Sequence, residues 1–124
     1  MREVFRSTGS VARGDDLGRL LEDHHMGDFV ELAKLIVSGA VFGFDWNNTF
    51  WIPMFQFDLS DLSVKPAPQR VRAELAHAFD GWSLAAWFAE PNAWLNHRRP
   101  VDLLDSKLWE VLEAARADRF IATQ

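Results

Sequence analysis

Fifteen residues near the C-terminus, EPNAWLNHRRPVDLL from Glu90 to Leu104, combine the signals for a helix end, a turn and a helix start. Pro91 lacks a backbone N–H and cannot continue a helix that precedes it, whereas Pro100 suits the first turn of a new helix. Asn92 tolerates the left-handed backbone that is common just past a helix end. This segment, which we call the elbow, therefore predicts two short helices that meet at a fixed angle.

Helical patterns lie on both sides of the elbow. Apolar residues at helical spacing predict helices at about 68–79 and 82–89 before it. A short helix at 100–104 and a last helix at 106–118 follow, with Asp105 or Ser106 as the N-cap of the last one. The C-terminal half, residues 69–124, is therefore expected to be entirely helical.

The N-terminal half begins with residues 1–16, which have little apolar periodicity and are expected to form a partly ordered arm. Leu17, Leu20 and Leu21 then fit a short helix. A clearer helix is predicted at Asp28 to Ser38, with Asp28 as its N-cap and Gly39 as its stop. Its expected apolar face consists of Phe29, Leu32, Ala33, Ile36 and Val37.

From residue 40 to residue 57 the sequence is rich in valine and aromatic residues, and Asn47 and Asn48 interrupt the apolar run as a two-residue hairpin turn would. Pro53 cannot donate a ladder hydrogen bond, so we place it at a strand end or a sheet edge. Residues 17–58 therefore predict a helix–helix–hairpin subdomain. Polar residues and prolines at 59–68 predict a linker to the C-terminal half.

The predicted fold class is mainly α with one β-hairpin. At 124 residues, with no Cys and no Tyr, the chain has no disulfide framework, thiol nucleophile or tyrosine acid. We expect a cytoplasmic protein, because no apolar run is long enough to span a membrane and no signal peptide is recognisable. No cofactor motif or catalytic constellation is present, so we expect no enzyme and no cofactor.

The elbow and its flanks resemble a known family. The order W-F-x-E-P-N-x-x-L, then R-R-P-x-D-L-L, then a final helix is similar to the C-terminal toxin-binding domain of the bacterial Xre/MbcA/ParS antitoxins. The resemblance covers residues 69–117, and IPMFQFD before it is similar to the stretch that introduces this domain in many relatives. Family members often carry Gly in the turn where this chain has Asn96 and His97, and Asn96 can substitute because Asn tolerates left-handed backbone.

The resemblance implies an antitoxin that binds and occludes a RES-type toxin, a class that consumes NAD or transfers ADP-ribose. The residues that match the family motif, most of them expected to build the fold, are Trp87, Pro91, Asn92, Leu95, Pro100, Asp102, Leu103 and Leu104. The residues that we expect to contact the toxin are Trp94, Arg98, Arg99, Arg116, Arg119, Phe120 and Ile121. Phe120 and Ile121 either fold back onto the core or remain exposed and bind a partner. If they bind a partner, deletion of residues 118–124 should weaken toxin binding and leave the stability of the protein nearly unchanged.

Other functions remain open at the level of sequence. The N-terminal half loosely resembles a degenerate winged helix, which would suit a transcriptional regulator. Residues 1–63 carry ten acidic and five basic residues, however, and the helix at 28–38 offers a single Lys to DNA, so we expect no DNA binding. The aromatic residues of the hairpin are too numerous for its two faces, which favours packing against the C-terminal helices or a homodimer. A small ligand-binding protein is the remaining alternative.

Overall fold

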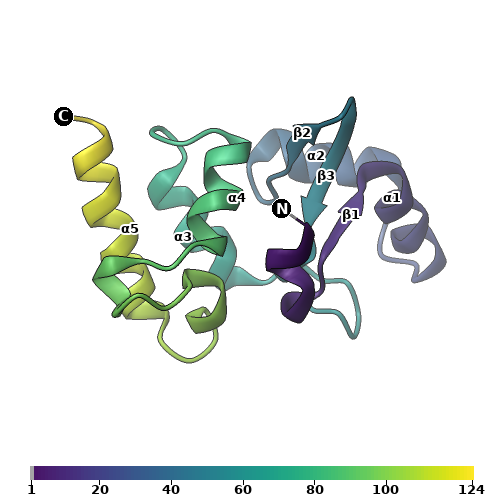
Figure 1. Ribbon diagram of the computed structural model, residues 1–124. Helices are drawn as coiled ribbons and strands as arrows, with labels where there is room; N and C mark the ends of the chain where they lie inside the picture. The colour runs from purple at the N-terminus through teal and green to yellow at the C-terminus, as the bar shows by residue number, and fades with distance from the viewer. Residues whose placement is uncertain (1) are drawn as a thin grey trace. The chain divides into compact units, whose positions relative to one another are not determined.

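The computed structural model describes the backbone of residues 2–124 and the side chains from Phe5 onward. The chain forms two compact units, Met1–Lys65 and Pro66–Gln124 (Figure 1). The boundary between them falls inside the linker predicted at residues 59–68. Helices predominate and the strands form a small antiparallel sheet, which confirms the predicted fold class.

The first unit combines two α-helices with a three-stranded antiparallel sheet in residues 2–65. Its elements in chain order are the 3₁₀ helix η1 (Arg2–Thr8), β1 (Val11–Arg13), α1 (Gly14–Asp23), α2 (Phe29–Ser38), β2 (Phe44–Trp46), β3 (Thr49–Pro53) and the 3₁₀ helix η2 (Met54–Gln56). The strand order is β1-β3-β2, so β3 is central.

The predicted hairpin is confirmed as β2 and β3, whose register pairs Trp46 with Thr49. Asn47 and Asn48 form the turn with φ values of 52° and 59°. Two consecutive left-handed residues match the right-handed twist of the flanking strands, and Asn is one of the few residue types that adopts this conformation at small cost. Pro53 ends β3, as predicted.

The expected arm at residues 1–16 is instead folded from Arg2 onward, and Met1 lies outside the described residues. Val11 pairs with Pro53, which makes β1 an additional strand beside the hairpin. The Phe5 side chain in η1 is fully buried, and its ring stacks on Phe55 with centroids 5.5 Å apart. The Phe42 and Phe55 rings meet edge-on with centroids 6.1 Å apart. Residues of η1 and η2 thus pack against some of the aromatic side chains that are too numerous for the two faces of the hairpin.

Helix α2 has the predicted ends but a different buried face. The Asp28 carboxylate accepts the Glu31 N–H at 3.0 Å, and Gly39 closes the helix at φ 82°, so both predicted caps are confirmed. Leu32 is buried as expected. Val37, which we expected on the apolar face, is instead 88% exposed, because the helix turns the side that carries Leu35 toward the core.

A buried glutamine closes the loop between α2 and the sheet. The Gln56 side chain accepts the Phe42 N–H at 2.8 Å and donates to the Phe42 carbonyl at 2.8 Å and to the Pro53 carbonyl at 3.0 Å. A buried amide is tolerated only when its polar atoms are paired, and here both its ends are used. The apolar core below it consists of Leu17, Leu21, Leu32, Val41, Ile52, Met54, Phe57 and Leu62.

The second unit is helical, as predicted. Its elements are α3 (Pro66–Leu75), α4 (Gly81–Ala89), the 3₁₀ helices η3 (Ala93–Leu95) and η4 (Pro100–Leu103), and α5 (Leu108–Ala122). Helix α3 packs along α5 (Figure 1). Within residues 2–124, no helix is both long enough and apolar enough to cross a bilayer.

Helix α5 differs from the prediction at both ends. Neither Asp105 nor Ser106 caps it, since the N-cap residue is Lys107 and its side chain makes no capping bond. The helix also continues four residues past the predicted end at Asp118, to Ala122. Residues 119–122, which lie beyond the predicted helix end, therefore form its last turn, and tertiary contacts of Asp118 and Arg119 hold that turn in place.

Candidate partner-binding site

The elbow is a small closed loop pinned by backbone hydrogen bonds. Asn92 and Arg98 form an antiparallel bridge, in which the Asn92 N–H donates to the Arg98 carbonyl at 3.0 Å. The His97 N–H donates to the Asn92 carbonyl at 2.9 Å. Asn96 and His97 have φ values of 57° and 63°, which confirms the left-handed conformation that we predicted for Asn96.

Asn92 itself is not left-handed, contrary to our expectation. Its φ is −117°, and its side-chain oxygen accepts the Trp94 N–H at 2.9 Å, so it acts as the N-cap of η3. The reason is that α4 already ends at Ala89, and Glu90 leaves that helix with extended backbone. Asn92 therefore lies outside α4 and can act as the N-cap of η3.

One carboxylate ties the elbow to α5. Asp118 accepts the Trp87 Nε1–H at 2.7 Å and the Asn92 Nδ2–H at 3.1 Å with Oδ2, and the Trp94 Nε1–H at 2.9 Å with Oδ1. Hydrogen bonds to an ionised acceptor are stronger than neutral ones. Three donors, one from α4, one from η3 and Asn92 from the segment between them, thus converge on a single side chain of α5.

Sequence reasoning missed Asp118, although a signal existed. Asp118 follows the buried Val111 by seven residues, so it lies on nearly the same side of α5 as the apolar stripe. A carboxylate in line with buried residues requires donors from another element. The three donors are 24 to 31 residues away, and nothing local in the sequence identifies them.

A small surface pocket lies beside this carboxylate. Its lining residues are Trp87, Glu90, Pro91, Asn92, Ala93, Trp94 and Asp118. Trp87 is buried, whereas 58% of Trp94 remains exposed although its indole nitrogen is hydrogen-bonded. Trp94, which we expected to contact the toxin, is therefore anchored by its indole nitrogen while more than half of the residue faces solvent.

Most of the family-motif residues build the fold. Six of the eight are buried, namely Trp87, Asn92, Leu95, Pro100, Leu103 and Leu104. Pro91 and Asp102 are exposed.

Helix α4 precedes the elbow, and its N-terminus is capped by Asp80, whose carboxylate accepts the Ser83 N–H at 2.8 Å. That backbone hydrogen bond, together with the Ser83 side chain, lowers the pKa of Asp80 below its usual 3.8.

The two arginines of the elbow differ from each other. Arg98 is exposed as predicted, and its Nε donates to the Leu95 carbonyl at 3.3 Å. Arg99, which we expected to contact the toxin together with Arg98, is only 26% exposed in its side chain, and its Nε lies 3.5 Å from the Asp102 carboxylate. Its Nε and Nη2 are buried and find no hydrogen-bond partner in the part of the chain that the structure describes.

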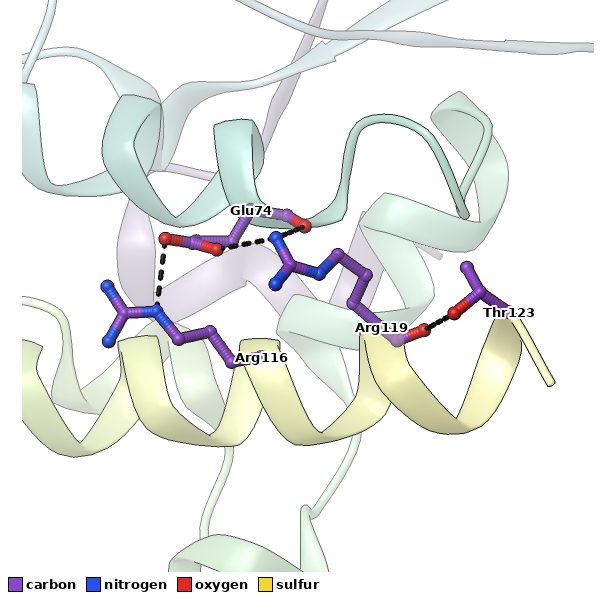
Figure 2. A network of polar contacts seen from close by, with 4 residues as sticks. All are labelled: Glu74, Arg116, Arg119 and Thr123. Carbon is purple, nitrogen blue, oxygen red and sulfur yellow. Dashed lines mark hydrogen bonds and ion pairs between the residues drawn. The ribbon is translucent and has the colours of Figure 1, made fainter.

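The two arginines of α5 are engaged within the unit. Figure 2 shows Arg116 and Arg119 reaching from α5 to Glu74 of α3. Arg116 Nε lies 3.1 Å and Arg119 Nη1 lies 2.9 Å from the Glu74 carboxylate. Glu74 is 21% exposed in its side chain, so this carboxylate is partly shielded from water. Arg116 and Arg119 therefore connect α3 to α5, in addition to any role in binding a partner.

Phe120 and Ile121 are 66% and 59% exposed. They lie on the last turn of α5, so the alternative that they fold back onto the core is wrong. Deletion of residues 118–124 would remove the Asp118 and Arg119 contacts together with these two side chains, so we now expect it to lower stability as well as to weaken binding.

No cluster of three or more His, Cys, Asp or Glu side chains suited to a metal ion occurs in the part of the chain that the structure describes.

The comparisons with known proteins find no match among protein-family models, curated proteins or solved structures. The link to the antitoxin family accordingly consists of the motif residues given above.

Proposed function

We propose that this chain is an antitoxin-like protein of a type II toxin–antitoxin system, which binds a RES-type toxin in the bacterial cytoplasm and occludes its pocket. In this proposal the chain is a binding protein and performs no catalysis. The second unit carries the binding surface, and the elbow is its centre.

The observation that carries the proposal is the state of Trp94. A side chain that is fixed by a 2.9 Å hydrogen bond and is still 58% exposed loses little conformational entropy when a partner covers it. Trp and Arg are the residue types most enriched among the side chains that dominate binding energy at protein interfaces. Trp94 with the exposed Arg98 provides both types on one loop.

Helix α5 extends the proposed surface. Ile121 follows Asp118 by three residues, so it lies one turn further along the helix on a neighbouring side. Ile121 is 59% exposed, and it lies three residues after the carboxylate that binds the Trp94 indole. Because Arg99 and Arg119 are engaged in ion pairs, we assign the main contacts to Trp94, Arg98 and Ile121.

The toxin class follows from the family resemblance. Antitoxins of this kind block access to the pocket in which RES-type toxins use NAD. Six of the eight motif residues that would build such a domain are buried here, and backbone hydrogen bonds close the elbow, which suits a rigid inhibitor that presents a preformed surface.

The test is co-expression of this chain with the product of the adjacent open reading frame, followed by affinity capture and an assay of NAD consumption. The proposal predicts a stable complex in which NAD consumption is suppressed, and toxicity when the neighbouring product is expressed alone. A complex that fails to form, or one that consumes NAD at the rate of the free toxin, would overturn it.

A further inference from the structure

The outer side of α5 carries four residues in a chemically symmetric order. Trp109, Glu113, Arg116 and Phe120 are spaced by four, three and four residues, which at 100° per residue places them within an arc of about 60°. Trp109 is 62% and Phe120 is 66% exposed, and the Arg116 side chain is 42% exposed. We call these four residues the outer stripe of α5.

The outer stripe is separate from the proposed toxin-binding surface. Trp109 and Asp118 are nine residues apart, so they lie on roughly opposite sides of the helix, about 180° from each other. The residues of α5 that face the unit's own core are Val111, Leu112, Ala114 and Ala115. Neither the core nor the elbow therefore covers the outer stripe.

The two charged residues of the outer stripe, Glu113 and Arg116, can each form an additional ion pair. The guanidinium of Arg116 lies 5.5 Å from the centre of the Trp109 ring, and only its Nε bonds to Glu74. In Figure 2 the two terminal nitrogens of Arg116 point away from Glu74. The Glu113 side chain is exposed, and no ion pair engages it within residues 2–124. A donor and an acceptor thus lie side by side between two aromatic residues.

We propose that the outer stripe is the interface between two copies of this chain, with α5 packed antiparallel on α5 of the second copy. The order aromatic, acid, base, aromatic keeps its 4-3-4 spacing when it is reversed. An antiparallel pair therefore places Trp109 opposite Phe120 of the second copy and Glu113 opposite Arg116 of the second copy. A two-fold axis between residues 114 and 115 repeats each pair, as a two-fold symmetric interface requires.

The charges determine the direction of packing. In a parallel pair each residue would face its own equivalent, so two carboxylates and two guanidinium groups would be juxtaposed. In the antiparallel pair both charge contacts are attractive. The aromatic contacts lie at the two ends, where they shield the ion pairs between them from water.

The size of the surface sets the expected affinity. A helix of 15 residues is about 22 Å long, so a pair of such helices buries less than the ~1,600 Å² of a standard interface. The dimer should therefore dissociate on dilution through the micromolar range.

The test is sedimentation velocity of the full chain over a micromolar concentration series. The variants are Glu113→Arg, Arg116→Glu, an equimolar mixture of the two, and Phe120→Ser, with thermal unfolding to verify the fold of each. Glu22→Arg on α1 is the matched control, because it makes the same charge change at an exposed position in the other unit.

The wild type and Glu22→Arg should dimerise alike, and each stripe variant should weaken dimerisation by roughly tenfold or more. The mixture should recover the dimer. In a mixed pair the Glu113→Arg chain carries two arginines in its stripe and the Arg116→Glu chain carries two glutamates, so both charge contacts are attractive again.

A monomeric wild type, or Glu113→Arg and Phe120→Ser variants that dimerise like the control, would overturn the proposal. If Arg116→Glu does not fold, because it brings two carboxylates together at Glu74, the other two variants decide the outcome.

Discussion

The Asp118 carboxylate accepts the indole N–H of Trp87 at 2.7 Å, across 31 residues of sequence. The same carboxylate also holds Asn92 and Trp94. This one side chain thereby fixes α4, the elbow and α5 to one another. Its loss should affect both the stability of the second unit and the orientation of the exposed Trp94 ring.

Asp118→Ala should therefore destabilise the protein by about 2 kcal/mol, because three N–H donors lose an ionised acceptor and two of them belong to buried side chains. Chemical denaturation followed by tryptophan fluorescence measures the change. Glu110→Ala is the matched control on the same helix, since Glu110 makes only a 3.8 Å surface ion pair with Lys107. Equal stability of the two variants would contradict the role assigned to Asp118.

Truncation separates the structural part of the last turn from its exposed part. A chain that ends after Arg119 loses Phe120 and Ile121, which are exposed, and should unfold within about 0.5 kcal/mol of the full chain. A chain that ends after Ala117 also loses the Asp118 and Arg119 contacts and should be less stable by about 2–4 kcal/mol. Urea unfolding of both truncated chains tests this, and similar stabilities would be inconsistent with it.

Gln56→Leu should destabilise the first unit by about 2–4 kcal/mol, because the N–H and carbonyl of Phe42 and the carbonyl of Pro53 lose their partner in a buried setting. Thermal unfolding followed by circular dichroism is the measurement. Gln69→Leu on α3 makes the same chemical change at an exposed position and should have little effect. A Gln56→Leu variant as stable as the wild type would show that the loop finds other partners.

Acid should weaken the start of α4 through Asp80. The folded-state pKa of Asp80 lies below its usual 3.8, because the Ser83 N–H and then the Ser83 side chain hydrogen-bond to the carboxylate. A depressed pKa stabilises the fold above the unfolded value, and this contribution is lost as the pH falls through the folded value. Stability should thus decline below about pH 4.

Asp80→Asn is the comparison for the acid measurement, since Asn also caps helices but does not titrate. Unfolding curves at a series of pH values should show a smaller acid-induced loss of stability for this variant than for the wild type. Because Asp58 also has a lowered pKa, through the Ser60 side chain and backbone, some acid sensitivity should remain. Identical pH profiles would exclude Asp80 as a contributor.

Local signals in the sequence predicted several elements correctly. Asp28 and Gly39 end α2 as caps, Asn47 and Asn48 turn the hairpin, and Asn96 takes the left-handed conformation. Each of these depends on the backbone preference of one or two residues, which is independent of the rest of the fold.

The features that were missed depend on distant partners. Strand β1 has three residues and exists because it pairs with β3, and η1 is fixed by the burial of Phe5 against Phe55. Similarly, α5 extends to Ala122 because Arg119 reaches Glu74, 45 residues away. Periodicity cannot reveal such contacts, since it reports only which side of an element is apolar.

In the proposed function, the exposed Trp94 of the elbow binds a toxin that uses NAD. The most direct measurement is the NAD-consumption rate of the neighbouring gene product titrated with the wild-type chain, Trp94→Ala and Trp46→Ala. Trp46 is the control, a comparably exposed tryptophan of the first unit at 48%. Wild type and Trp46→Ala should inhibit alike, and Trp94→Ala should need at least about tenfold more protein. Inhibition by Trp94→Ala equal to that of the wild type, or no inhibition by any of the three, would contradict the claim.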